Sequence, residues 1–318
     1  MRASICIPLY NASPWIAQTL HSVVHQISAK DEVILIDDNS SDDSAQIAFD
    51  VLNSANIQFT LTKNIRNGAC AARNQALKTS EGEFIQWLDA DDVLGAHKLS
   101  SAIRHLERHP TQMHACCWRS FQGDFEESQF SNDVNWRIIP EFSSPAEWLA
   151  RDTFMGLHCY AGHRDLFEQA GPWDESLTIN QDGEYFARVV AKSEGVRFTR
   201  ETEVFYRRSS EVSVSRFSPE KADSLYRSTA SMVITALGLE DSDRMQQMAA
   251  NRWQHFIYTV YPSRSDLLAR AESHLKNLPK PNISNPNAVS PLSKAVSNTL
   301  GWKTLTYARL LRARIQSR

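Results

Sequence analysis

The chain has 318 residues, of which 42% are hydrophobic and 22% are charged, and its formal net charge is -3. These values are typical of a folded protein with an ordinary surface, and they argue against nucleic acid as a partner. Five cysteines without a CxxC motif argue against a disulfide framework and a zinc knuckle, and they favour a reducing cytoplasmic location. The apolar run in MRASICIPLY is too short for a signal peptide, and no window approaches the roughly 18 to 20 apolar residues of a membrane span.

Up to about residue 119, short apolar runs alternate with amphipathic segments. The predicted strands read SICIPL, EVILID, IQFTLT, FIQWL and MHACCW, and the predicted helices cover residues 13–28, 43–55, 69–80 and 96–109. This alternation predicts an α/β fold with a single open, mostly parallel sheet flanked by helices. Ligands bind at the carboxyl ends of the strands in such sheets, where this chain reads PLYN, DDNSSDD, TKN and DADD. We therefore expect one site built from several loops.

From about residue 120 to 216 the alternation is less regular, with a strand expected near 157–163, a helix near 181–193 and a strand in VRFTRETEVFYRR. Helices are predicted from 217 to about 277, after a Ser-Pro-Glu start. Four prolines in LPKPNISNPNAVSPL indicate a linker. The predicted division is an α/β domain over 1–216, with halves 1–119 and 120–216, a helical C-terminal region over 217–277, and a linker with a basic tail over 278–318.

Three carboxylates, Asp89, Asp91 and Asp92, directly follow the predicted strand FIQWL. They repel one another unless something positive lies between them. Capping of the next helix would explain two of the three acids, but Asp89 at the strand end is harder to explain in that way. A hard cation such as Mg²⁺ or Mn²⁺ resolves the repulsion, since it is often bound by one or two carboxylates together with substrate phosphates. The chain has no GxGxxG and no P-loop lysine motif, so metal chelation is the remaining way to hold a diphosphate.

Asp37 and Asp38 end the second predicted strand, just before a helix that a later serine or aspartate can cap. An aspartate in this place can accept hydrogen bonds from a nucleobase or a ribose. Tyr10, at the end of the first strand, can stack on the base. An ordinary half-buried aromatic is the other interpretation of Tyr10.

The segments PLYN, VILIDDNSSDDS, NIRNGACAARNQAL, EGEFIQWLDADDVL, AGPWDES and QDGEYFARV occur in this order. Together they resemble the family 2 nucleotide-sugar glycosyltransferases, which have the GT-A fold, over roughly residues 3–216. The resemblance implies an inverting, metal-dependent enzyme that moves a sugar from a nucleoside-diphosphate sugar, with UDP the expected nucleotide, to a hydroxyl group. The implied acceptor is a saccharide or a lipid-linked saccharide, in polysaccharide or glycolipid assembly.

By this resemblance Asp89 and Asp91 form the DxD motif of the family and would hold Mn²⁺ or Mg²⁺, with Asp91 expected to touch the metal. Tyr10 would lie against the nucleobase, Asp38 would hydrogen-bond to it, and Arg73 would add a further donor contact. The implied donor-binding residues are Pro8, Tyr10, Asp37, Asp38, Asn67, Arg73, Asp89 and Asp91.

Asp182 matches the catalytic base of the family, and Glu184 is the alternative. A single base on the face opposite the leaving group suits inversion, because no second carboxyl nucleophile is then needed. The resemblance also implies that Trp173, Asp174 and His163 lie on the acceptor side.

One departure concerns the segment YRRSSEVSVS, where family members often carry a histidine and this chain has none. Arg207 or Arg208 is expected to contact the diphosphate instead, or water to fill the third metal position. His158 and His163 are more typical of surface or core histidines than of metal ligands.

After Glu272 the chain carries eight basic residues and no acidic residue. Apolar residues recur among them at approximately helical spacing: Val296, Leu300, Trp302, Leu310, Leu311 and Ile315. Two interpretations stay open, namely a helix that docks on the protein's own acidic part and an interfacial helix on the anionic inner face of the cytoplasmic membrane.

Two rival functions are also considered. One is a catalytically inactive scaffold that binds a nucleotide sugar. The other is a haloacid-dehalogenase-type phosphatase, in which Asp89 of FIQWLDADDV would be the nucleophile, although GDFEES does not supply the acid pair which that class requires.

Overall fold

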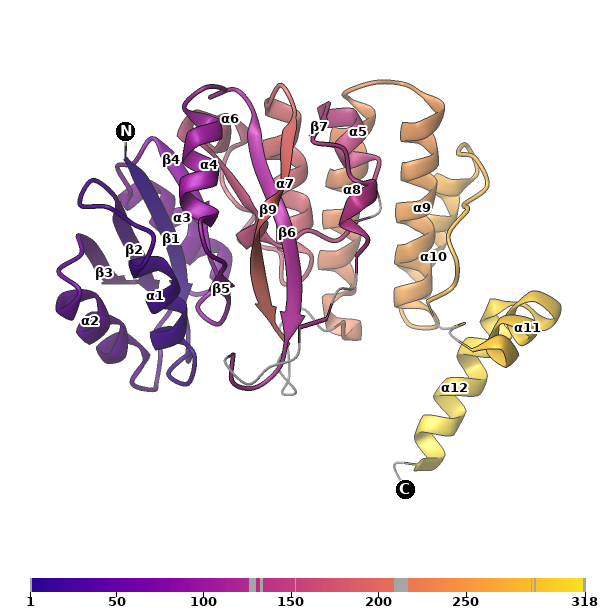
Figure 1. Ribbon diagram of the computed structural model, residues 1–318. Helices are drawn as coiled ribbons and strands as arrows, with labels where there is room; N and C mark the ends of the chain where they lie inside the picture. The colour runs from indigo at the N-terminus through magenta and orange to yellow at the C-terminus, as the bar shows by residue number, and fades with distance from the viewer. Residues whose placement is uncertain are drawn as a thin grey trace. The chain divides into compact units, whose positions relative to one another are not determined.

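The computed structural model describes residues 2–125, 130–131, 134–151, 153–208, 217–286, 288 and 290–316. The chain forms two compact units, drawn in Figure 1. Met1–Leu177 and Gln181–Val214 make up the first unit, and Thr178–Asn180 and Ser215–Arg318 make up the second. The division after Val214 lies beside the boundary at residue 216 that was expected from the sequence.

One half of the first unit's sheet is parallel. Its strands are β1 (Ala3–Leu9), β2 (Glu32–Asp37), β3 (Phe59–Lys63) and β4 (Phe84–Trp87), in the spatial order β3-β2-β1-β4. Every residue of β2 is buried, as expected of a parallel strand that helices cover on both faces. The helices between and after these strands are α1 (Ile16–Val24), α2 (Ser44–Ser54), α3 (Ala69–Thr79) and α4 (Lys98–Leu106).

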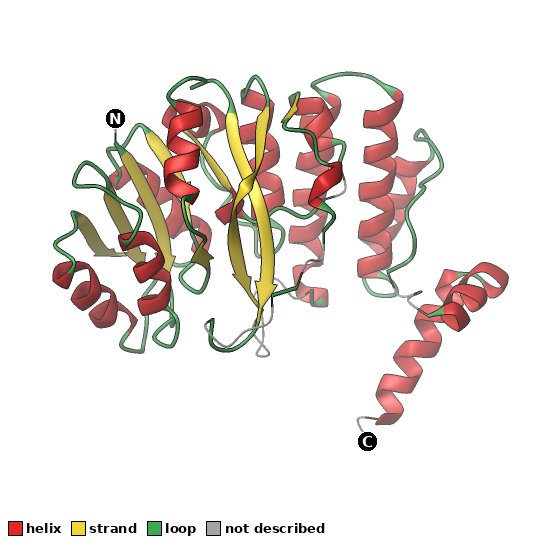
Figure 2. Cartoon of the chain, viewed as in Figure 1, coloured by secondary structure: helices red, strands yellow, loops and turns green. Residues whose placement is uncertain are grey.

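The sheet continues beyond β4 through a strand of opposite direction. β8 (Tyr160–His163) pairs antiparallel with β4, and β6 (Met113–Phe121), β9 (Val196–Arg207) and β5 (Val93–Leu94) follow, with β7 (Phe142–Ser143) beside β9. Among the described strands β1, β2, β3, β4, β6 and β9 run in one direction, whereas β5, β7 and β8 run in the other. Figure 2 shows the sheet with helices on its faces, so the predicted open sheet flanked by helices is confirmed.

The remaining elements of this unit are short, apart from α7. They are the helices α5 (Pro145–Leu149), α6 (Arg164–Ala170) and α7 (Gln181–Lys192), and two 3₁₀ turns over Trp136–Ile138 and Leu157–Cys159. Residues of α6 and α7 pack under β4, where Trp87 meets Phe167, Trp173 and Tyr185 edge to face. This aromatic core fixes the start of α7 relative to the end of β4.

The second unit is helical. It contains a 3₁₀ turn (Pro219–Lys221) and the helices α8 (Ala222–Leu237), α9 (Asp243–Val260), α10 (Ser265–Leu275), α11 (Pro291–Leu300) and α12 (Trp302–Gln316). Trp302 packs edge to face on Tyr258 and Tyr261, and Lys303 lies 3.4 Å from Glu272. The start of the basic tail therefore contacts its own unit. None of the helices built from described residues is long and apolar enough to cross a membrane.

Candidate active site

The carboxyl ends of β1, β2 and β4 meet at one edge of the sheet. Leu9 pairs with Asp37 and Cys6 with Trp87, so the residues that follow these strands are neighbours. Tyr10 follows β1 with 61% of its surface exposed, and Pro8 is half-buried within the strand. The ring of Tyr10 is therefore accessible to a base, and its predicted stacking role remains a prediction.

Asp38 ties the end of β2 to the beginning of α3. Its carboxylate accepts hydrogen bonds from the backbone N–H of Gly68 at 2.9 Å and from Nδ2 of Asn64 at 2.7 Å. Gly68 has φ of 108°, a conformation that favours glycine. A carboxylate has about four acceptor positions, so Asp38 keeps capacity for a ligand, and nucleotide binding by Asp38 stays a prediction.

Two further donor-side candidates help to shape the same loops. Asp37 is buried and accepts a hydrogen bond from the backbone N–H of Ser40 at 3.0 Å. The exposed Asn67 accepts one from Nδ2 of Asn39 at 3.0 Å. Both residues thus hold the β2 loop in place, whether or not they also touch the donor.

The three acids after β4 have different partners. Asp89 accepts a hydrogen bond from Arg73 at 2.9 Å. Asp92 is fully buried, accepts a hydrogen bond from the backbone N–H of Arg207 at 2.9 Å and lies 2.7 Å from Nδ1 of His158. Burial disfavours the charged imidazole, but Asp92 raises the pKa of His158 well above its usual value. Asp89 and Asp92 are therefore compensated by cationic side chains.

Asp91 is compensated less, since no cationic side chain in the described part of the chain forms an ion pair with it and the attraction of Arg207 is the smallest influence on its pKa. Burial, together with repulsion from Asp92 and Asp89, raises the pKa of Asp91 to about 8. A divalent cation between Asp89 and Asp91 would reverse this effect, because it favours the charged form. The described residues contain no cluster of three metal-ligating side chains. Asp89 and Asp91 could therefore hold a cation only if phosphates and water completed its shell, and this metal site stays a prediction.

Arg73 joins this acid cluster to the start of α7. Its Nη1 donates to Oε1 of Gln181 at 3.1 Å and lies 3.9 Å from Asp182, while Nη2 bonds Asp89. The guanidinium lies over the ring of Trp173, 4.7 Å from its centroid. Burial disfavours the charge, yet Asp89 and Asp182 raise the pKa of Arg73. One buried cation thus connects the predicted metal ligand to the predicted base.

Asp182 lies in the first turn of α7, with 28% of its side chain exposed. It accepts a hydrogen bond from the backbone N–H of Leu157 at 3.3 Å. Burial raises the pKa of Asp182, Arg73 opposes this shift, and Asp89 adds to it. A carboxylate with a raised pKa is a better proton acceptor. The alternative, Glu184, is buried and held by Arg188 through two hydrogen bonds of 2.7 and 2.9 Å, which gives it a packing role.

The structure places His163 away from the acids, and its acceptor-side role stays a prediction. His163 pairs with Phe84, the first residue of β4, and Phe84 precedes Asp89 by about 16 Å of extended chain. Because β8 runs antiparallel to β4, the end of β8 lies at the opposite edge of the sheet from the acids. The residue that β8 brings to the site edge is His158, just before the strand, and no local pattern in the sequence indicates the direction of this strand.

Trp173 and Asp174 lie on the segment before α7. The side chain of Trp173 is 1% exposed and its ring stacks on that of Tyr185 with 3.9 Å between the centroids, so it supports Arg73 from the core, and its acceptor-side role stays a prediction. The side chain of Asn74 hydrogen-bonds to both the backbone N–H and the backbone oxygen of Trp173. Asp174 is exposed and accepts a hydrogen bond from the backbone N–H of Ser176 at 2.9 Å. Its acceptor-side role stays a prediction.

Arg207, one of the two arginines expected to contact the diphosphate, is buried and already has partners within the protein. It is 4% exposed and donates to the backbone oxygen of Asp91 at 2.8 Å and to Oε1 of Gln18 at 2.6 Å. Its guanidinium lies between the rings of Trp15 and Phe121, 4.4 Å from each centroid. Arg207 therefore fixes the loop of the acids. Arg208 is exposed, and residues 209–215 of YRRSSEVSVS lie outside the described part.

Residues 4–171, more than half of the chain, match the sequence profile of "Glycosyl transferase family 2". The chain belongs to glycosyl transferase family 2. The predicted GT-A fold is confirmed by the structure of residues 1–349 of TarS from Staphylococcus aureus in complex with UDP-GlcNAc. The TM-score is 0.67 at 18% identity, over 88% of this chain and 82% of that one. The family match also leaves the phosphatase alternative without support.

Two named family members resemble parts of the chain. The poly(ribitol-phosphate) β-N-acetylglucosaminyltransferase TarS of Staphylococcus aureus is 32% identical over 111 residues, or 34% of this chain and 19% of TarS. The Escherichia coli protein WfgD, a UDP-Glc:α-D-GlcNAc-diphosphoundecaprenol β-1,3-glucosyltransferase, is 41% identical over 101 residues, or 31% of this chain and 39% of WfgD. The matched region thus spans less than half of either relative.

Proposed function

We propose that the chain is an inverting glycosyltransferase that uses a nucleoside-diphosphate sugar, most simply a UDP-sugar, with Mn²⁺ or Mg²⁺. The observation that carries the proposal is the placement of Asp89 and Asp182 on either side of the Arg73 guanidinium, at the edge where Tyr10 and Asp38 also lie. A donor whose diphosphate lies near Asp89 and Asp91 would have its sugar close to Asp182. UDP is favoured because TarS was solved with UDP-GlcNAc and WfgD is named for UDP-Glc.

The roles of the chain's own residues follow from this placement. Asp182 accepts the proton of the acceptor hydroxyl, so that the oxygen attacks the anomeric carbon as the bond to the diphosphate breaks with its electron pair. Arg73 favours the ionised form of Asp182 and holds it in place through charge. Asp89 and Asp91 would hold the metal ion, which as a Lewis acid stabilises the charge on the leaving diphosphate. Tyr10 and Asp38 would orient the nucleoside.

The acceptor and the location are proposed more broadly. The names of TarS and WfgD describe a polyol-phosphate polymer and a lipid-linked saccharide as acceptors, so a saccharide or lipid-linked saccharide in polysaccharide or glycolipid assembly is proposed here. Peripheral contact with the inner face of the cytoplasmic membrane is proposed through α11 and α12, because Leu292, Leu300 and Leu311 are exposed among the basic residues.

The first experiment is thermal unfolding of the purified chain with UDP, GDP, CDP or dTDP, each with Mn²⁺ or with a chelator. A ligand at 100 times its dissociation constant adds about 2.7 kcal/mol to the free energy of unfolding. The expected result is a shift for UDP that the chelator removes. No shift with any nucleotide would contradict the proposal, and a shift without turnover of any donor sugar would favour the inactive scaffold instead.

A further inference from the structure

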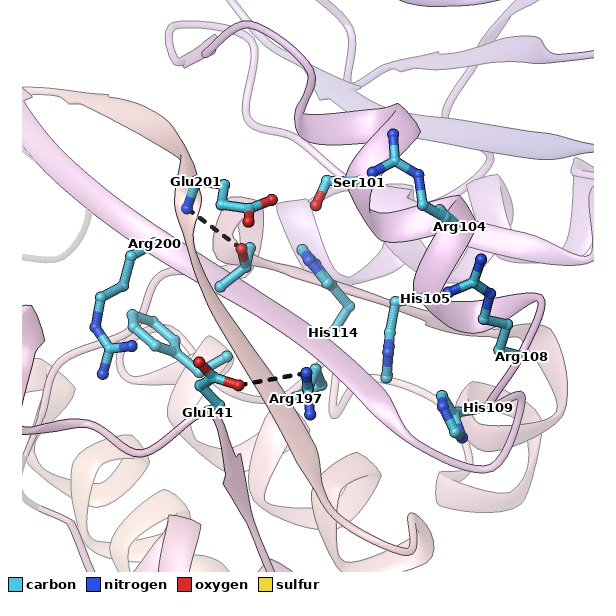
Figure 3. Close-up of a pocket in the computed structure, with 12 residues that line it drawn as sticks. Ser101, Arg104, His105, Arg108, His109, His114, Glu141, Arg197, Arg200 and Glu201 are labelled. Atoms are coloured by element: carbon cyan, nitrogen blue, oxygen red, sulfur yellow. Dashed lines mark hydrogen bonds and ion pairs between the residues drawn. The ribbon is translucent and has the colours of Figure 1, made fainter.

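A second polar pocket lies in the first unit, away from the acids, beside α4 and the beginnings of β6 and β9. Figure 3 shows its lining side chains. The pocket has a volume of about 440 Å³ and is lined by four arginines and three histidines but only two glutamates. It differs from the site at the end of β4 in both position and sign of charge, and the proposed transfer reaction does not use it.

The arginines of this pocket are incompletely neutralised. Arg197 on β9 lies 3.4 Å from Glu141. Arg104 and Arg108 are exposed, and neither guanidinium has an ion-pair or hydrogen-bond partner among the described residues. Arg104 lies in the last turn of α4 and Arg108 two residues beyond its end, and both line the pocket, where their like charges repel each other. An anion in the pocket would relieve that repulsion.

The histidines supply a second and independent observation. The ring of His105 lies 5.1 Å from that of His109 and 6.1 Å from that of His114. His114 is 1% exposed, and neither of its ring nitrogens has a hydrogen-bond partner in the described structure; Nε2 of His105 also lacks one. Buried polar groups without partners are unfavourable, so these nitrogens have capacity for a partner that the protein itself does not supply.

The positive surroundings also determine the charge of these rings. Burial, Lys98 and His105 hold the pKa of His114 well below its usual value. Burial, His109 and Arg197 lower the pKa of His105 to about 4. Both rings are therefore neutral near pH 7, and a neutral imidazole still carries one N–H donor. No three-ligand metal cluster occurs among the described residues, so donation to an anion is the better use of these nitrogens.

A simpler explanation accounts for only part of the pocket. Basic side chains are favourable at the carboxyl end of a helix, where they face its partial negative charge. This effect explains Arg104 in the last turn of α4 and Arg108 just after the helix. It does not explain Arg197, which comes from a strand, or the unpartnered nitrogens of the buried His114.

We propose that this pocket binds a small phosphate-bearing anion through the guanidinium groups of Arg104, Arg108 and Arg197 and the ring N–H groups of His105 and His114. The planar fork of arginine matches phosphate oxygens and forms charge-assisted hydrogen bonds with them. The volume exceeds that of inorganic phosphate alone and falls in the range of small-molecule pockets. The pocket therefore has room for a phosphorylated small molecule.

The test uses inorganic phosphate as the probe of the shared chemistry. Phosphate is titrated calorimetrically into the full chain in a chelating buffer, with sodium chloride keeping the ionic strength constant. The wild type is compared with Arg104→Gln/Arg108→Gln and with the control Lys30→Gln/Lys78→Gln, which removes two exposed charges elsewhere. We expect saturable binding of phosphate to the wild type. In the arginine variant the affinity should fall by about tenfold or more for each charge-assisted hydrogen bond lost. In the lysine control the affinity should be unchanged.

Three results would overturn the proposal. They are the absence of phosphate binding to the wild type, equal affinity of the wild type and the arginine variant, and equal weakening in the lysine control, which would indicate net charge alone. A second measurement does not depend on a variant: phosphate should shift the imidazole NMR signals of His105 and His114 while leaving those of His21 and His25 in place. Unshifted signals of His105 and His114 would place the phosphate elsewhere.

Discussion

Acidic side chains gather at the end of β4, and basic side chains gather at the beginnings of β6 and β9. The two groups differ in how far the surrounding residues neutralise them. At the end of β4, Arg73 and His158 compensate two acids and leave Asp91 with a raised pKa. In the pocket beside α4, two arginines and the nitrogens of a buried histidine have no partner among the described residues. The first site is largely neutralised by the chain itself and lacks one cation, whereas the second lacks an anion.

This difference indicates how each site responds to its ligand. Because cationic side chains hold Asp89 and Asp92 in place without a metal, the site at β4 is preorganised. Its ligand has to provide positive charge at Asp91 only. Arg104 and Arg108 are exposed and have no partner among the described residues, so their ligand also has to order them. Substitutions at the β4 edge should therefore have larger effects than substitutions elsewhere on the sheet.

The largest effect is expected from Asp182→Asn. An amide cannot accept the proton of the acceptor hydroxyl, so transfer should fall by about 10² to 10⁴-fold. Donor binding should stay nearly intact, because the metal ligands are unchanged. Steady-state transfer assays and calorimetric titration of UDP with Mn²⁺ measure the two quantities. Glu184→Gln serves as the comparison and should retain transfer in its folded fraction; equal loss of donor binding and transfer in Asp182→Asn would reject its role as base.

Arg73→Met breaks the compensation at β4 directly. Removing one partner of a buried charge pair leaves the other charge unpaired. Because Asp89 is 31% and Asp182 28% exposed, the free energy of unfolding should fall by about 2 to 4 kcal/mol, less than for fully buried charges. Urea unfolding at neutral pH tests this value. The control is Arg66→Met, since Arg66 pairs with Glu175 but is 70% exposed; a similar loss there would show that the location of Arg73 is not special.

Much of the β4 site was predictable because β1 to β4 are parallel. A repeating strand and helix pattern brings all their carboxyl ends to one edge, so Tyr10, Asp38 and Asp89 could be placed together from their positions after apolar runs. The partners of these acids could not be predicted in that way. Arg73 reaches Asp89 from a helix, and His158 reaches Asp92 because β8 is antiparallel, which no local pattern reveals.

The pocket beside α4 was not predicted at all. Its residues come from a helix end and from two strands that are separated by about 80 residues in the sequence, and each arginine alone looks like an ordinary surface cation. The short elements β5, β7, α5 and α6 were also missed, because two to seven residues carry too little periodicity to indicate a strand or a helix.

Asp91→Asn removes the acid that lacks a cation. Metal-dependent binding of UDP should be lost, as measured by calorimetry with Mn²⁺. Without metal, the free energy of unfolding of the variant should depend less on pH than that of the wild type. The folded-state pKa of Asp91 is raised from 3.8 to about 8, so the folded protein holds this proton more tightly, and stability falls as the pH rises between these values.

The raised pKa of His158 also makes stability fall as the pH rises. Because His158 is present in both the wild type and Asp91→Asn, this effect cancels when the two are compared. Denaturant unfolding at several pH values in a chelating buffer measures the slope of the free energy of unfolding against pH for the wild type and for Asp91→Asn. A wild-type slope equal to that of Asp91→Asn would show that Asp91 carries no excess proton in the folded state. Addition of Mn²⁺ should reduce the wild-type slope, because the cation favours the ionised carboxylate.

The smallest effect is expected from His163→Ala, at the opposite edge of the sheet. The ring of His163 packs on Phe84 and its Nδ1 accepts a hydrogen bond from the backbone N–H of Asp165 at 3.3 Å. Its loss should lower the free energy of unfolding by about 1 kcal/mol, as for other helix caps, and leave transfer within about twofold, a change near 0.4 kcal/mol. Steady-state assays at several acceptor concentrations test this expectation. A raised KM for the acceptor with unchanged kcat would mean that the acceptor extends about 16 Å from Asp89 to the far edge, and the separation of the two edges would then no longer hold.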